Sequence, residues 1–231
     1  MLPGLGEERI MKRTYMACCG KTICNGCIYT VQSRAYEAGR SEEDDICPFC
    51  RTPPPSSHAE LIKRYKERVE LNDKNALYCL GCLYSKGKYG LPQDLVKALE
   101  LWHRAAKLGS AQAYHNIGYA YRNGRGVEFD MKKALHYTEL AAIGGNVESR
   151  YNLGCFMGQA CNLDRAVKHW MIAVHDGDHM ALEGIKKLYR VGRATKDDYT
   201  EALRSYQSYQ DQIKSDQRDE AAASGVEINI S

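Results

Sequence analysis

From residue 73 onward the sequence repeats itself with a period of about 36 residues, and this repetition constrains the fold more than any other feature. Gly81, Gly118 and Gly154 lie 37 and 36 residues apart. Four alanines each follow an Asp or an Asn by four residues: Asp94 and Ala98, Asp130 and Ala134, Asn162 and Ala166, Asp198 and Ala202. A period of this length with two helical segments per unit is typical of a helical solenoid, in which each unit packs on its neighbours.

The physical roles within one unit can be assigned from the residue types. In the unit that shows the pattern most fully, we expect a first helix over Ala111–Asn123. Gly118 on this helix lets a partner helix approach closely, and Gly124 ends the helix by supplying left-handed backbone angles. Asp130 is expected to cap the second helix, which should run to about Ile143. Each unit is therefore predicted to be a helix–turn–helix pair.

These residues resemble the Sel1-like repeat family, a relative of the tetratricopeptide repeats. The positions that carry the resemblance in this unit are Ala113, Gly118, Tyr121, Gly124, Gly126, Val127, Asp130, Lys133, Ala134, Ala141, Ala142 and Gly145. The resemblance covers 73–209, in units of about 73–109, 110–145, 146–177 and a degenerate terminal unit, 178–209. It implies a mainly α protein, an α/α superhelical solenoid that acts as an adaptor for an unknown protein partner, and it brings no catalytic residue.

The segments around the array are expected to be short. Residues 1–14 carry no pattern and are predicted to be unstructured, and the polar residues 210–231 are predicted to form a tail. Residues 56–72 should form a connector helix capped by Ser56 or Ser57, and Ser57 with Glu60 three residues later matches a capping box. Three prolines just before it, in 52–57, favour an extended, semi-rigid link.

Six of the ten cysteines fall within residues 18–50. They form an adjacent pair and two Cys-x2-Cys pairs: Cys18 and Cys19, Cys24 and Cys27, Cys47 and Cys50. Thiolates are soft ligands, and structural zinc takes four of them in a closed tetrahedron. A segment of about forty residues buries too little surface to fold alone, so a metal would supply the free energy of folding. The alternative of buried free thiols is disfavoured by the turn residues Gly20, Gly26 and Pro48 beside these pairs.

Residues 15–55, with this cysteine pattern, resemble the later two-thirds of a RING-type zinc finger in an all-cysteine variant, with Lys21 where many members have a histidine ligand. The resemblance implies that the ligand pairs are interleaved, so that the first and third pairs bind one zinc ion and the second and fourth pairs bind the other. One zinc site is then complete and consists of Cys18, Cys19, Cys47 and Cys50, whereas Cys24 and Cys27 belong to a second site that lacks two ligands. Residues 1–17 contain no Cys or His, so we expect either a late start of the chain or a half-built RING.

The RING resemblance implies an E3 ubiquitin-protein ligase, which positions a loaded ubiquitin-conjugating enzyme without catalysing the chemistry itself. Pro48 and Arg51 stand where the family contacts that enzyme, although Arg51 is equally readable as a solvated cation. The missing ligand pair favours an alternative, a non-enzymatic interaction scaffold. A metal-dependent hydrolase is disfavoured because all-thiolate zinc sites have no open position. The pairing of a RING segment with Sel1-like repeats resembles a set of diatom proteins.

Charge and hydropathy argue against nucleic acid and membranes as partners. A net charge of +3 over 231 residues gives no basic footprint for nucleic acid. No apolar run reaches membrane-spanning length and residues 1–13 lack a signal-peptide core, so we expect an intracellular protein, with cytoplasm and nucleus left open.

Cys79 and Cys82 also spell Cys-x2-Cys, but they align with helix packing positions of the other units. Trp102 and Trp170 are likewise expected to pack between helices.

Overall fold

The computed structural model describes residues 13–24, 27–31, 33 and 46–214, and this part is mainly α-helical, as expected. The chain order is β1 (Arg13–Met16), β2 (Lys21–Cys24), α2 (His58–Glu70), α3 (Lys74–Lys86), α4 (Leu95–Lys107), α5 (Ala111–Asn123), α6 (Met131–Ile143), α7 (Val147–Gln159), α8 (Leu163–His175), α9 (His179–Arg190) and α10 (Lys196–Ile213). Residues 27–31 and 33 are also helical, and the rest of the stretch between the two halves of the cysteine segment lies outside the described residues.

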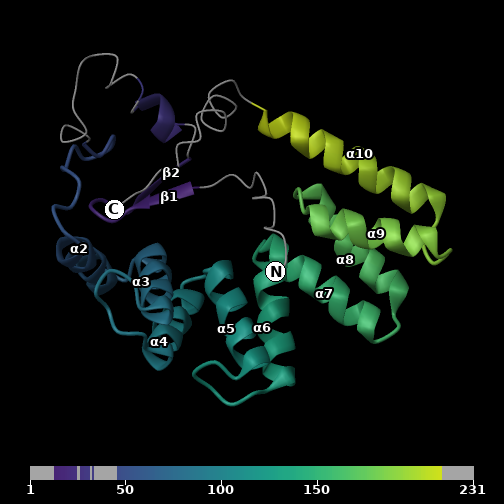
Figure 1. The fold of residues 1–231 in the computed structure, drawn as a ribbon, viewed down its shortest axis with the longest axis horizontal. Helices are drawn as coiled ribbons and strands as arrows, with labels where there is room; N and C mark the ends of the chain where they lie inside the picture. Colours follow the sequence, from purple (N-terminus) through teal and green to yellow (C-terminus); the bar gives the residue numbers. More distant parts are fainter. Residues whose placement is uncertain (1–12, 25–26, 32, 34–45, 215–231) are drawn as a thin grey trace, which may run out of the picture.

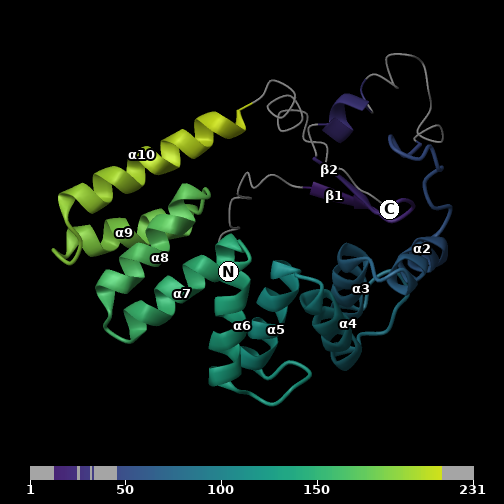
Figure 2. The same cartoon turned by 180° about the vertical axis from the view of Figure 1, so that it is seen from behind.

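Helices α2 to α10 form an arc of packed pairs, with the β1–β2 hairpin on its inner side and α10 at the opposite end (Figures 1 and 2). The closest packing joins α3 to α4, α5 to α6 and α7 to α8, the two helices of each of the first three predicted units. One cluster of buried side chains runs from Ile62 in α2 to Ala120 in α5, and another from Ala166 in α8 to Ala202 in α10. The predicted α/α solenoid is confirmed.

Acidic and amide side chains set the starts of the second helices, as the repeat pattern predicts. Asp94, Asp130 and Asn162 each accept a hydrogen bond from the backbone amide three residues on, at 2.8, 3.0 and 3.3 Å. The last unit differs. There Thr195 is the N-cap of α10, and Asp198 is the third helical residue, whose carboxylate accepts from the Thr195 amide at 2.8 Å. The last helix therefore begins three residues earlier in the repeat than the others, with a full capping box.

The repeated glycines are sites of close helix approach. A Cβ built on Gly81 would lie 2.6 Å from the indole nitrogen of Trp102, and one on Gly154 would lie still closer to Trp170. Both tryptophans are largely buried, at 7% and 9% exposure. Trp170 also donates a hydrogen bond to the Tyr151 carbonyl at 3.2 Å. The predicted packing role of the two tryptophans is confirmed, and glycine is required because the indole occupies the space of a side chain.

Two boundaries need correction. Strand β1 begins at Arg13, so the last two residues of the expected unstructured N-terminus are ordered, because Tyr15 stacks on Tyr65 with ring centroids 6.0 Å apart. Helix α10 continues to Ile213, into the expected polar tail, because Tyr209 packs directly over Gly177. Residues 1–12 and 215–231 lie outside the described residues.

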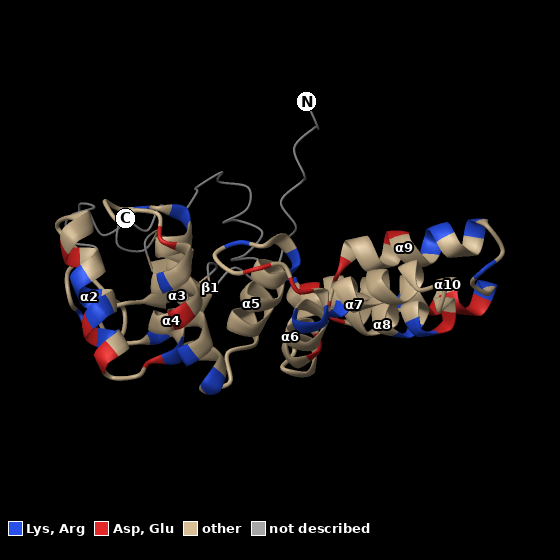
Figure 3. Cartoon of the chain, turned by 90° about the horizontal axis from the view of Figure 1, so that it is seen from below, with Lys and Arg blue, Asp and Glu red and all other residues tan. Residues whose placement is uncertain are grey.

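The charged surface is mixed in sign. Seen from below, the ribbon positions of Lys and Arg are interspersed with those of Asp and Glu along the described helices (Figure 3). On α2, for example, Lys63 lies 3.9 Å from Glu67, and both are exposed. Within the described residues, no helix is both long enough and apolar enough to cross a bilayer.

Candidate metal centre

The first cysteine pair lies in the turn of the hairpin. Strands β1 and β2 pair antiparallel, with Met16 opposite Lys21, so Cys18 and Cys19 sit in the connecting loop. The Met16 carbonyl accepts hydrogen bonds from the amides of Cys19 (3.2 Å) and Gly20 (2.8 Å). Gly20 has a φ of 75°, a left-handed conformation that suits glycine. The tight turn presents two adjacent sulfurs at one end of the hairpin.

The second cysteine pair lies in a turn that closes on itself. The Arg51 amide donates to the Cys47 carbonyl at 2.9 Å, and the Cys47 amide donates to the Thr52 carbonyl at 2.9 Å. Arg51 takes a left-handed φ of 58° at the end of this turn. Two hydrogen bonds thus hold Cys47 and Cys50 on one side of the loop.

The two turns meet and bring four sulfurs together. The Sγ atoms of Cys18, Cys19, Cys47 and Cys50 all lie within 4.8 Å of one another. The Cys18–Cys50 distance is 3.4 Å and the Cys19–Cys47 distance is 3.8 Å. Zinc–sulfur bonds of about 2.3 Å place the sulfurs of a tetrahedral site about 3.8 Å apart. The donor set and its spacing therefore fit a closed, four-thiolate metal site.

The ionisation of these thiols reflects their crowding. Burial raises the pKa of Cys18, and hydrogen bonds with Cys50 and Cys47 raise it further. Burial likewise raises the pKa of Cys19. The pKa of Cys50 falls to about 6, chiefly because the Thr52 hydroxyl, 3.1 Å away, donates a hydrogen bond to its sulfur. Neighbouring thiolates repel one another, and a divalent cation removes that repulsion, so metal binding would release protons from this cluster.

The other predicted ligand pair does not form a comparable group. The Sγ atoms of Cys24 and Cys27 lie 3.2 Å apart, and the Cys27 amide approaches the Cys24 sulfur at 3.4 Å. In the parts of the chain that the structure describes, the four-cysteine cluster is the only group of three or more Cys, His, Asp or Glu side chains close enough to hold one metal ion. Within the described residues, Cys24 and Cys27 therefore form a pair only, and their assignment to a second zinc site stays a prediction.

The two predicted contact residues are exposed beside the cluster. Pro48 and Arg51 both lie on the outside of the second turn, with Phe49 between them at 46% exposure. Lys21 lies over the Phe49 ring, 5.8 Å from its centroid, and thereby links the two turns from outside the sulfur cluster. An apolar and cationic tip is thus presented next to the four sulfurs.

Cys79 and Cys82 occupy helix packing positions in α3, as predicted. Burial raises the pKa of Cys79 to about 12 and also raises that of Cys82. The Cys82 sulfur accepts a hydrogen bond from Asn116 of the next repeat at 3.5 Å. Sequence reasoning missed Thr52, the second residue after Cys50, because it stands at the start of the proline link. A hydroxyl residue so soon after a cysteine pair is the one signal that could have suggested it.

Comparisons with known proteins identify the class of the repeat array. Residues 74–110 and 111–146 match the family model of the Sel1 repeat. A Sel1 repeat protein from Oxalobacter formigenes superimposes with a TM-score of 0.60 and 23% identity, covering 82% of this chain and 74% of that one. The protective antigen c5321 of uropathogenic Escherichia coli, which displays the same repeat fold, superimposes with a TM-score of 0.57 and 23% identity. This match covers 81% of this chain and 38% of that one. Residues 74–146 therefore carry two Sel1 repeats, and the array as a whole shares the fold of Sel1-repeat solenoids.

Curated relatives share the repeats over short stretches. Chitin synthase regulatory factor 4 of Schizosaccharomyces pombe is 27% identical over 135 residues, which is 58% of this chain and 21% of that protein. The ERAD-associated E3 ubiquitin-protein ligase component HRD3 of Candida glabrata is 32% identical over 84 residues, 36% of this chain and 10% of that protein. Human protein sel-1 homolog 2 is 37% identical over 68 residues, which is 29% of this chain and 10% of that protein. The chain thus spans about a tenth to a fifth of the length of these relatives.

Proposed function

We propose that this protein is a zinc-binding adaptor, in which the Sel1-type solenoid binds one protein partner and the cysteine module presents a second contact surface. The observation that carries the proposal is the convergence of four thiols within 4.8 Å from two separate turns. Cys18, Cys19, Cys47 and Cys50 would hold the ion. A closed four-thiolate zinc supplies folding free energy rather than catalysis. The zinc content of the purified full chain tests this function: one tightly held ion is expected, and a chain without bound zinc would contradict it.

The relatives support the adaptor role. Their names describe a regulatory factor for chitin synthase and a component of an E3 ubiquitin-protein ligase. In both names the protein acts together with an enzyme. A solenoid also offers an extended surface of stacked helices, which is the usual means by which repeat proteins bind partners.

A second candidate function is favoured by the exposed turn at the metal centre. We propose that Pro48, Phe49 and Arg51 form a surface for a ubiquitin-conjugating enzyme, in the manner of a RING finger. An exposed apolar pair beside an exposed arginine suits a protein contact, because arginine offers a rigid fork of donors for carbonyl and carboxylate groups. The resemblance of the cysteine pattern to a RING finger and the similarity to an E3 ligase component point the same way.

An autoubiquitination assay tests this second function. With the zinc-loaded full chain, activating enzyme and a panel of conjugating enzymes, we expect ubiquitin chains whose rate of formation falls about tenfold or more in Arg51→Ala, because a central interface arginine contributes about 2 kcal/mol. The control is Lys63→Ala, which removes an exposed cation on α2 that pairs with Glu67 at 3.9 Å. An unchanged rate in Arg51→Ala would contradict the proposed contact. Failure of the zinc-loaded wild-type chain with every conjugating enzyme would reject the second function and leave the adaptor role.

A further inference from the structure

Both cysteine-bearing turns are fastened to the same face of α2. Arg64 and Arg68 are four residues apart on this helix, so their side chains lie one above the other. Arg68 reaches the hairpin turn that carries the first cysteine pair. Arg64 reaches the segment that follows the second pair. The connector helix therefore contacts the chain beside each half of the four-sulfur cluster, at Gly20 and at Pro53, through two neighbouring arginines.

The contact at Arg68 centres on Asp73. Arg68 donates from Nε and Nη2 to Oδ2 of Asp73, at 3.2 and 2.7 Å. The Tyr15 hydroxyl, from strand β1, donates to the same oxygen at 2.8 Å. Gly20 lies directly on this pair, since a side chain there would overlap the Arg68 guanidinium and Asp73. The hairpin turn beside Cys18 and Cys19 thus rests on a largely buried ion pair, with 26% and 12% of the Arg68 and Asp73 side chains exposed.

Asp73 also starts the repeat array. Its other oxygen, Oδ1, accepts hydrogen bonds from the amides of Asn75 (3.0 Å) and Ala76 (3.3 Å), so it is the N-cap of α3. Burial raises the pKa of Asp73, but the hydrogen bonds from Arg68, Tyr15 and the two amides outweigh burial and hold the pKa below its usual value. One carboxylate therefore serves the hairpin with one oxygen and the first helix of the first repeat with the other.

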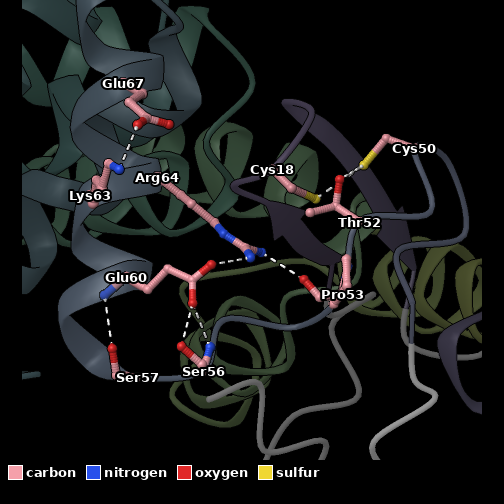
Figure 4. A network of polar contacts seen from close by, with 10 residues as sticks. All are labelled: Cys18, Cys50, Thr52, Pro53, Ser56, Ser57, Glu60, Lys63, Arg64 and Glu67. Carbon is pink, nitrogen blue, oxygen red and sulfur yellow. Dashed lines mark hydrogen bonds and ion pairs between the residues drawn. The ribbon is translucent and has the colours of Figure 1, made fainter.

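The contact at Arg64 fixes the second turn. Arg64 donates to the Pro53 carbonyl at 2.8 Å and pairs with Glu60 one helical turn earlier (Figure 4). The Glu60 carboxylate also accepts from the amide and hydroxyl of Ser56, at 2.7 and 2.6 Å. The capping box predicted from the sequence is thus only half formed. Ser57 accepts from the Glu60 amide at 3.2 Å, but the Glu60 carboxylate reaches Ser56 and Arg64 instead of the Ser57 amide. The exit from the second cysteine turn is thereby pinned to α2.

We propose that α2 is the platform on which the metal centre is assembled, and that Asp73 is the positioning residue that links metal binding at the four cysteines to the folding of the first Sel1 repeat. The inference rests on the proposed zinc-binding function and deepens it. Because Asp73 holds the hairpin turn and caps α3 at once, metal binding and order at the start of the array stabilise each other. Such coupling is reciprocal: whatever zinc adds to the stability of the repeats, the folded repeats add to zinc affinity.

The test is Asp73→Asn, compared with Asp94→Asn. Asparagine caps helices about as well as aspartate, so α3 keeps its N-cap, but an amide NH2 replaces the oxygen that receives Arg68 and Tyr15. Asp94 is the corresponding N-cap of α4, where its carboxylate accepts from the Lys97 amide. Zinc affinity is measured by competition with a chromophoric chelator on the full chain. We expect Asp73→Asn to weaken zinc binding about tenfold, within the usual range of coupling between sites, and Asp94→Asn to leave it unchanged.

A second readout is the thermal midpoint of the solenoid, followed by far-ultraviolet circular dichroism with and without zinc. The increase caused by zinc should shrink in Asp73→Asn and persist in Asp94→Asn. Tyr15→Phe, which removes one hydroxyl and keeps the ring stacked on Tyr65, should weaken zinc binding in the same direction if Asp73→Asn folds too poorly to be measured. Wild-type zinc affinity retained by both Asp73→Asn and Tyr15→Phe would overturn the inference. A wild-type chain that binds no zinc would instead reject the proposed function on which it rests.

Discussion

Replacing Cys47 with serine is expected to abolish tight zinc binding and to raise the dissociation constant by more than about 100-fold, beyond the usual cost of losing a residue that supports a ligand. Cys47 is the most buried of the four clustered cysteines, with 4% of its surface exposed, and its sulfur lies 3.8 Å from that of Cys19. A serine hydroxyl does not ionise at neutral pH and is a poor ligand for zinc, so only three thiolates remain. Chelator competition on the full chain measures the change.

The matched control is Cys79→Ser. Cys79 belongs to a third Cys-x2-Cys sequence, but it lies at a packing position of α3, where burial raises its pKa to about 12. We expect this variant to lose some stability and to bind zinc with wild-type affinity. Unchanged zinc affinity in Cys47→Ser, or an equal loss in Cys79→Ser, would contradict the assignment of the metal centre.

Gly154→Ala is expected to lower the free energy of unfolding of the solenoid by about 1–2 kcal/mol. Alanine normally favours a helix over glycine by roughly 0.5–1 kcal/mol. Here the added methyl group would overlap the indole of Trp170, which is held in place by its hydrogen bond to the Tyr151 carbonyl at 3.2 Å. Overpacking of this kind costs about 1–3 kcal/mol. Chemical denaturation followed by circular dichroism gives the difference.

The same substitution one helical turn later provides the control. A methyl group on Gly158, also in α7, would meet only the Ala166 side chain at an ordinary 4.0 Å. Gly158→Ala should therefore raise the free energy of unfolding by about 0.5–1 kcal/mol through helix propensity. If both variants changed the free energy of unfolding in the same direction, the claim that Gly154 makes room for the Trp170 indole would be wrong.

The helices of the solenoid follow closely from the sequence because their signals are local. Ser110 and Asp130 cap α5 and α6, and Gly124 ends α5 in a left-handed conformation. The residues that determine each helix boundary therefore lie at that boundary in the sequence. The same locality explains the departure at α10. Asp198 keeps its place in the repeat, but it closes a capping box with Thr195, three residues earlier, and the helix therefore starts there.

The metal centre follows from the sequence only in part. The spacing of Cys47 and Cys50 predicts a turn, but nothing local predicts that Cys18 and Cys19 lie in a hairpin. Strands of four residues, such as β1 and β2, are too short for their residue types to predict a strand from the sequence. The hairpin is held by a contact between Tyr15 and Asp73, which are 58 residues apart, and such a contact depends on the finished fold. Tertiary packing, rather than propensity, therefore decides where the cysteines meet.

The number of zinc ions that each chain holds tightly is the most direct test of the four-cysteine site. Elemental analysis of the purified full chain, after dialysis against a moderate chelator, should find one zinc per chain. That ion should disappear in Cys47→Ser and remain in Cys79→Ser. Absence of zinc from the wild-type chain would contradict the four-cysteine site, and two tightly held ions would contradict the inference that Cys18, Cys19, Cys47 and Cys50 form the one complete ligand set.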